Sequence, residues 1–254
     1  MSGGHAHRLY RHGDTPVHRL PPQCKIVAAL AFVVAVVATP REQVWAFGLY
    51  ALVLAAVAAA ARVPAGFVAR RMLVEVPFVA FALGLPFIVH GRPVAIAGIT
   101  VSAAGLWAAW NILAKATLGI TASILLAATT EPRTLLVGIE RLGLPPLLVQ
   151  IASFMLRYAD VILDELRRMR IARTSRGFDA RDVRHVRTLA RSLSAVFLRS
   201  YERGERVYVA MASRGYEGRS PVIRELPVSA AQWAAAGLVP AVAAVTAATA
   251  WAVN

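Results

Sequence analysis

Long apolar segments dominate the first half of the chain and its carboxyl end. They fall at about 22–39, 44–61, 72–89, 106–130 and 228–253. A helix needs roughly 20 residues to cross a hydrocarbon core about 30 Å thick, and each segment is close to that length. The pattern therefore predicts an all-α integral membrane protein with about five transmembrane helices.

A weaker apolar stretch at 93–105 is rich in Gly, Ser and Thr. This composition favours an interfacial or re-entrant segment over a full crossing, although a sixth span stays open as an alternative. The predicted organisation is therefore a tail at 1–21, four spans within 22–130, an inserted module at 131–224 and a last span within 225–254.

The inserted module has the period of amphipathic helices. Apolar residues recur every three or four positions at Leu148, Ile151, Met155, Tyr158, Ile162, Leu166 and Met169. This spacing predicts a helix of about 30 residues that begins at Pro145–Pro146 and ends near Gly177. A second helix of the same kind is predicted to end at Gly215. Both helices are expected to lie outside the membrane.

Basic residues are distributed unevenly between the predicted loops. The chain carries a net charge of +14, and successive loops before residue 131 hold four, one, three and one Lys or Arg. The module at 131–224 contains 18 more, together with 10 acidic residues. Because cytoplasmic loops are enriched in Lys and Arg, the amino terminus and the module are predicted to be cytoplasmic and the carboxyl end extracytoplasmic.

The ends of the two module helices carry a repeated motif, A-x-x-S-R-G followed by an aromatic residue, with its copies 38 positions apart. The motif residues are Ala172, Ser175, Arg176 and Gly177 in the first copy and Ala210, Ser213, Arg214 and Gly215 in the second. One interpretation is a pair of helix C-caps, in which Gly ends the helix and Arg balances the helix dipole. The other is a duplicated docking element, because capping does not require the same Ser-Arg-Gly triplet twice.

Two charged residues, Glu75 and Lys115, lie inside otherwise apolar segments. Ionisable groups at such positions are functional candidates. The proximity of Glu75 to Arg70 and Arg71 favours an interfacial position, whereas Lys115 lies deeper. Lys115 could pair with Glu75, reach an interface or face a partner, and these alternatives stay open.

Catalytic and metal-binding patterns are not found in the sequence. There is one cysteine, Cys24, and no Walker A, G-x-S-x-G or H-E-x-x-H motif. The histidines of the tail, His5, His7, His12 and His18, lie among Gly, Arg and Pro without a fixed scaffold. We therefore expect no enzymatic activity, no cofactor and no metal site. Nucleic-acid binding is disfavoured because the module's arginines alternate with an apolar stripe.

Three stretches carry a resemblance to a known family: Thr15–Ile26, Glu131–Phe178 and Ala210–Gly218. With these residues the chain resembles the transmembrane T subunit of energy-coupling factor (ECF) transporters, and within them the cobalt and nickel branch, CbiQ or NikQ. The resemblance covers nearly the whole chain. It implies four spans, a cytosolic coupling domain of crossed amphipathic helices and a last span, in bacterial or archaeal cell membranes.

The resemblance also implies a division of labour within an importer. Two cytosolic ATPase subunits hydrolyse ATP, a CbiM-like membrane subunit captures the solute, and the T subunit couples them. Arg176 and Arg214, with the motif residues around them, would each dock in a groove of one ATPase. A vitamin ECF importer is the alternative solute class. A self-contained secondary transporter is a further alternative, but it would need inverted repeats or a polar midplane site.

Overall fold

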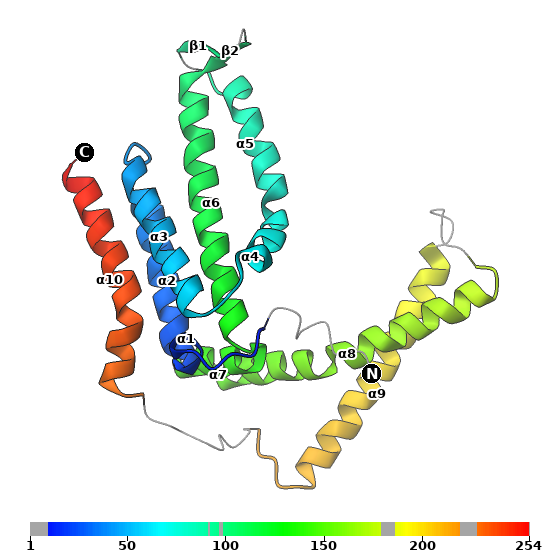
Figure 1. The fold of residues 1–254 in the computed structure, drawn as a ribbon. Coiled ribbons are helices and arrows are strands. Elements are labelled where there is room, and N and C mark those ends of the chain that lie inside the picture. The colour runs from blue at the N-terminus through cyan, green and yellow to red at the C-terminus, as the bar shows by residue number, and fades with distance from the viewer. Residues whose placement is uncertain (1–9, 91, 97–98, 179–185, 219–227, 254) are drawn as a thin grey trace. The chain divides into compact units, whose positions relative to one another are not determined.

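The computed structural model describes residues 10–90, 92–96, 99–178, 186–218 and 228–253. The chain forms two compact units. The membrane unit comprises Arg8–Leu142 and Pro227–Asn254, and the helix-pair unit comprises Gly143–Leu226. Both units are built from helices (Figure 1), so the predicted all-α membrane fold is confirmed.

Each unit contains the following described elements, in chain order. In the membrane unit they are α1 (Pro16–Arg19), α2 (Pro22–Ala38), α3 (Val44–Ala60), α4 (Ala65–Arg71), the 3₁₀ turn η2 (Met72–Glu75), α5 (Val76–Ile88), β1 (Pro93–Ile96), β2 (Ile99–Ser102), α6 (Ala103–Thr129), α7 (Pro132–Arg141) and α10 (Ala230–Ala252). The helix-pair unit contains α8 (Pro146–Ser175) and α9 (Val186–Ala212).

The stretch expected to be interfacial or re-entrant forms a β-hairpin instead. Strands β1 and β2 pair antiparallel, with Val94 opposite Val101. Residue Ala103 already belongs to α6, whose first turn is capped by the Ser102 hydroxyl. The stretch at 93–105 therefore adds no sixth span.

Helix length and composition alone do not distinguish the predicted transmembrane helices from the helices of the module. Four helices in the described part are long and apolar enough to cross a membrane: Ala65–Ile88, Ala103–Thr129, Pro146–Ser175 and Ala230–Ala252. Helices α2 and α3 are apolar but have 17 residues each. Helix α8, which the charge pattern places outside the membrane, is among these four helices. Its carboxyl-terminal part nevertheless holds two acids and three arginines between 164 and 170, which a hydrocarbon core accommodates poorly.

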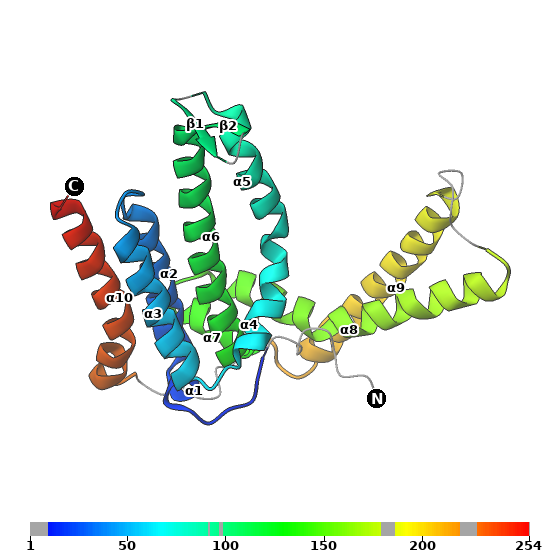
Figure 2. The same ribbon diagram turned by 45° about the horizontal axis from the view of Figure 1, so that its top comes forward.

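Helices α2, α3, α6 and α10 stand side by side in the membrane unit, and α5 packs on α6 (Figures 1 and 2). Helix α7 lies across one end of this bundle and contacts α2. Although α7 falls within the predicted module at 131–224, it therefore packs with the membrane helices.

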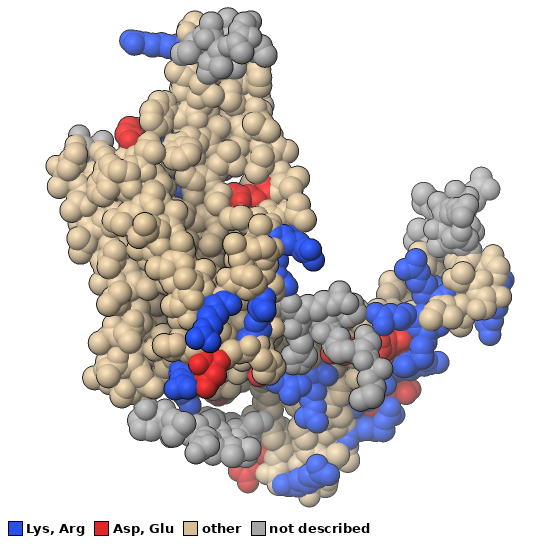
Figure 3. Space-filling view, viewed as in Figure 1, with Lys and Arg blue, Asp and Glu red and all other residues tan. Residues whose placement is uncertain are grey.

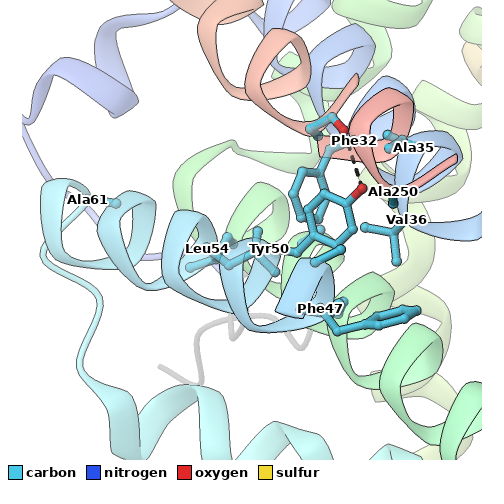
Figure 4. Packing of buried hydrophobic residues seen from close by; sticks show 14 of the residues in the cluster. Phe32, Ala35, Val36, Phe47, Tyr50, Leu54, Ala61 and Ala250 are labelled. Carbon is cyan, nitrogen blue, oxygen red and sulfur yellow. Dashed lines mark hydrogen bonds between the residues drawn. The ribbon is translucent and has the colours of Figure 1, made fainter. Parts of the chain in front are cut away.

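Tyr50 lies at the centre of the membrane unit's core. Its ring is fully buried and meets Phe32 and Phe47 edge to face (Figure 4). Its hydroxyl donates to the Ala243 carbonyl at 3.3 Å and lies 2.7 Å from the Thr39 hydroxyl. The Tyr50 hydroxyl thus joins α2, α3 and α10 and has hydrogen-bond partners within the apolar core.

Two glycines allow close approaches in the membrane unit. A Cβ at Gly105 on α6 would lie 2.6 Å from the Leu85 carbonyl oxygen and 2.7 Å from the Pro86 Cα atom. A Cβ at Gly138 on α7 would lie 2.9 Å from Pro22 on α2. Small residues at these positions permit the backbone contacts that drive helix association in membranes.

We expect Gly105→Ala to destabilise the purified protein by about 1–3 kcal/mol, because backbone atoms of α5 must move to admit the methyl group. Thermal unfolding in detergent measures this loss. Gly119→Ala on the same helix is the control, since nothing lies within 4 Å of its Cβ position and alanine favours helix. Equal unfolding temperatures for the two variants would contradict the close approach of α5 and α6.

Candidate functional site

The first copy of the repeated motif closes α8 with a Schellman turn. Gly177 has a positive φ of +74°. The backbone N–H of Phe178 donates to the Arg173 carbonyl at 3.1 Å, and that of Gly177 donates to the Thr174 carbonyl at 3.0 Å. These two hydrogen bonds define the Schellman turn and satisfy carbonyl groups at the end of the helix.

The second copy closes α9 in the same way. Gly215 has a φ of +82°. The N–H of Tyr216 donates to the Met211 carbonyl at 3.1 Å, and that of Gly215 donates to the Ala212 carbonyl at 3.0 Å. The predicted ends of both helices are therefore confirmed, and the two copies share one backbone geometry as well as one sequence.

The serines of the motif bond to their own helices. The Ser175 hydroxyl donates to the Ile171 carbonyl at 3.0 Å, and the Ser213 hydroxyl donates to the Ala210 carbonyl at 3.1 Å. The two alanines, Ala172 and Ala210, are exposed, as are the serines and glycines. Each copy therefore presents a small-residue surface beside one large side chain, the arginine.

Arg176 and Arg214 are both exposed and occupy the same position in their caps, directly before the glycine. Within the described residues, neither guanidinium makes a hydrogen bond or an ion pair. Backbone N–H groups supply the capping bonds, so the arginines are not needed to complete the helix ends. Lys and Arg atoms gather on the surface of the helix-pair unit, while the length of the membrane unit shows few (Figure 3).

Helices α8 and α9 run in opposite directions at an angle to each other (Figures 1 and 2), and their contacts place the two motifs at opposite ends of the pair. Arg173 donates to the Ser192 hydroxyl at 2.9 Å near one end, and the Gln150 amide donates to the Tyr216 hydroxyl near the other. Because Arg176 follows Gln150 by 26 residues, the motifs are separated by roughly 40 Å along α8 at 1.5 Å per residue. The eight predicted residues thus form two separate sites.

Lys115 binds the carboxyl end of a neighbouring helix, not Glu75. Its ammonium donates to the Val37 carbonyl of α2 at 2.8 Å. The Trp251 indole donates to the adjacent Ala38 carbonyl at 2.8 Å. Lys25, the other lysine in the sequence, donates to the Thr129 carbonyl at the end of α6 at 3.0 Å. Each lysine therefore donates to a carbonyl group at the end of the other's helix, where the backbone supplies no hydrogen-bond donor.

Glu75 is buried, with 6% of its surface exposed, at the 3₁₀ turn between α4 and α5. Its carboxyl oxygen accepts a hydrogen bond of 2.5 Å from the Thr117 hydroxyl of α6. Pairing with Lys115, one of the three alternatives left open by the sequence, is not formed, because the Lys115 ammonium bonds the Val37 carbonyl and Glu75 bonds Thr117. A 3₁₀ turn within an otherwise helical apolar segment marks a local irregularity, and Glu75 ties it to α6.

The tail histidines within the described residues have structural contacts. His18 lies 2.7 Å from the Thr15 hydroxyl through Nδ1 and 3.1 Å from the Arg11 carbonyl through Nε2, and burial lowers its pKa. His12 packs edge to face with Tyr10. His5 and His7 lie outside the described residues. In the part of the chain that the structure describes, no three metal-binding side chains come together.

Sequence reasoning missed the contact at the middle of the helix pair. Glu165 of α8 bonds Arg199 of α9 at 2.8 Å, and the same carboxylate lies 3.8 Å from Arg203. Arg199 lowers the pKa of this carboxyl, chiefly through the hydrogen bond. A signal was present, because Glu165 sits between Ile162 and Met169 along the apolar stripe, where a charged residue needs a partner.

A family model described as cobalt transport protein, CbiQ, matches residues 13–223. The match includes α1 to α9 and both copies of the repeated motif. The chain belongs to the CbiQ family. The resemblance seen in the sequence is therefore confirmed, and the two caps of this CbiQ-family chain lie within the matched region.

Curated relatives of the CbiQ-family chain cover most of its length. Proteins named energy-coupling factor transporter transmembrane protein EcfT are similar to it. Those of Bacillus selenitireducens and Thermosediminibacter oceani are each 28% identical, over 82% of this chain and 82% and 83% of their own lengths. An uncharacterised protein of Methanocaldococcus jannaschii is 26% identical over 59% of this chain and 54% of its own length.

If the backbone alone makes the caps, glycine and arginine substitutions should affect stability differently. We expect Gly177→Ala or Gly215→Ala to cost about 1 kcal/mol, since a side chain is strained at positive φ. Arg176→Ala or Arg214→Ala should change stability by less than about 0.5 kcal/mol. Thermal unfolding of the four variants shows whether the backbone alone or the arginine side chain completes the cap. Larger losses for the arginine variants would mean that these side chains complete the helix ends.

Proposed function

We propose that this CbiQ-family chain is the energy-coupling T subunit of an ECF transporter, without catalytic activity of its own. Two cytosolic ATPase subunits hydrolyse ATP, and the chain transmits their movement to a separate membrane subunit that captures the solute. The observation that carries the proposal is the pair of matching caps, each with an exposed arginine that its own helix does not use.

The chemistry of arginine suits docking at these ends. A guanidinium stays charged at neutral pH and offers a rigid set of five donors, which can bind carboxylates or helix-end carbonyls of a partner. The small residues beside each arginine, Ala172 and Ala210 among them, leave room for a partner's surface to approach. Two sites separated by roughly 40 Å along α8 can each engage a different ATPase subunit, so that movement of the ATPases acts on both ends of the pair.

Exposed apolar surface on the helix pair supports a second partner. Met155 of α8 is 68% exposed, and Phe197 and Val209 of α9 are 69% and 65% exposed. Such side chains are stabilised when a partner or lipid covers them. We assign this surface to the solute-capturing subunit, a CbiM-like protein, and to the bilayer at its border.

The proposed orientation follows from the distribution of charge. The amino terminus and the helix-pair unit face the cytoplasm and the carboxyl end faces outward, because basic residues concentrate in the tail and in the module at 131–224. Helix α8 then lies outside the hydrocarbon core despite its length, with its charged carboxyl-terminal part in water.

Cobalt is the proposed solute, with nickel as its chemical neighbour. The description of the matching family as cobalt transport protein supports this choice. The EcfT relatives carry no solute in their names, so a vitamin importer remains the alternative. The solute is set by the capturing subunit, since the described part of this chain brings together no metal-binding group.

Reversing the charge of either docking arginine should abolish ATP-driven uptake. We expect Arg176→Glu or Arg214→Glu to lose copurification with the ATPase subunits, while the chain still inserts and unfolds at the normal temperature. Arg→Lys should already reduce uptake about tenfold, because a point charge does not reproduce the guanidinium fork. Cobalt, nickel and vitamin uptake by the coexpressed complex, together with copurification, measures these effects.

Arg170 on α8 and Arg191 on α9 serve as matched controls, since both are exposed arginines outside the motif. Their replacement by Glu should leave assembly and uptake nearly unchanged. Equal effects at motif and control positions would reduce the result to a loss of net positive charge and refute the docking role.

A further inference from the structure

Glu165 occupies the middle of the α8–α9 pair and is the most enclosed charged group of that pair among the residues whose burial the structure describes. Its side chain is 11% exposed, whereas the neighbouring Asp164 side chain is 57% exposed. Residue Glu165 lies 15 positions after Gln150 and 11 before Arg176. The carboxylate is therefore placed about midway between the two caps.

The carboxylate contacts α9 at two points one helical turn apart. Oε1 accepts a hydrogen bond from Arg199 at 2.8 Å, and Oε2 lies 3.8 Å from Arg203. Positions four apart lie on the same face of a helix. A single contact would act as a pivot about which α9 could swing, but two contacts one turn apart along α9 restrain the angle between the two helices.

The surroundings of the carboxylate are basic. Arg199 and Arg203 face it from α9, and Arg168 acts on it from its own helix. These charges keep the pKa of Glu165 below its ordinary value, so the group is ionised at neutral pH. The stabilisation is present above the unfolded-state pKa, near 4.5, and is lost as the pH falls through the lowered folded-state value.

We propose that Glu165 is a positioning residue that sets the angle between α8 and α9, and with it the spacing of the two docking ends. This inference rests on the proposed function, because it matters only if both caps engage ATPases. Arg176 and Arg214 sit at the far ends of two long helices, so a small change of angle at the middle moves them by a large distance. Removing the carboxylate also leaves Arg199 and Arg203, one turn apart on α9, without their counter-charge on α8.

The direct test measures the distance between the two ends. Cys24→Ala first removes the sole cysteine of the sequence. Thr174 and Ala212, two exposed positions beside the caps, are then replaced by cysteine and spin-labelled. In the full chain in lipid nanodiscs, we expect a narrow distance distribution near the separation of the caps. Glu165→Ala should broaden or shift it, and Glu165→Arg should do so more strongly.

Asp164→Asn is the matched control, since Asp164 precedes Glu165 on the same helix and pairs only with Arg167 of that helix among the described residues. It should leave the distribution unchanged. The double variant Glu165→Arg with Arg199→Glu should narrow the distribution again, because it restores an ion pair of reversed polarity between the helices. Rescue of this kind is not expected from a merely misfolded protein.

Uptake by the coexpressed complex completes the test. ATP-driven uptake should fall about tenfold or more in Glu165→Arg and recover most of that loss in the double variant. An unchanged distance in Glu165→Ala, or a broadened distance with normal uptake, would overturn the positioning role. Failure of the docking proposal is recognised separately, since Arg176→Glu would then leave uptake intact whatever the spin-label distances show.

Discussion

Carbonyl groups at the carboxyl ends of helices are the constraint on which both units depend. Each helix leaves its last carbonyls without intrahelical donors, and within an apolar environment no water supplies them. In the membrane unit the donors come from other elements: Lys115 and Trp251 serve α2, and Lys25 serves α6. These bonds fix the helices relative to one another as they satisfy the backbone.

The helix pair solves the same problem within each helix. Gly177 and Gly215 turn the chain so that backbone N–H groups reach the free carbonyls. The cations beside these caps are therefore left available, in contrast to the two lysines. This difference between engaged lysines and unengaged arginines is the physical reason for assigning Arg176 and Arg214 to partner binding.

Periodicity and turn residues were sufficient to predict the all-α membrane fold and the ends of α8 and α9. Pro146 begins α8, and the positive φ of Gly177 ends it where a side chain would be strained. The hairpin at 93–102 was not foreseen, because its alternation is short and its Gly, Ser and Thr content suggested an irregular segment. Helix α8 was predicted as an amphipathic helix, although its length and hydropathy also fit a transmembrane span.

Tertiary pairing was harder to predict than local structure. The sequence offered Glu75 as a partner for Lys115, but α6 directs Lys115 towards α2 and Thr117 towards Glu75. The bridge from Glu165 to Arg199 joins residues 34 apart, and nothing local distinguishes Arg199 from the other arginines of α9. The period of apolar residues predicts which face of a helix is buried. Which side chain on a neighbouring helix pairs with a given charge depends on how the helices are placed in space.

Site-specific photocrosslinking tests the central claim, that the two caps contact ATPase subunits. A photoreactive amino acid replaces Ala172 or Ala210 in the coexpressed complex, and Arg168 or Glu202 provides an exposed control position on the same helices. Covalent adducts with an ATPase subunit are expected from both motif positions and from neither control. Adducts that are absent from both caps, or equally abundant at the control positions, would contradict the docking of the ATPases at these helix ends.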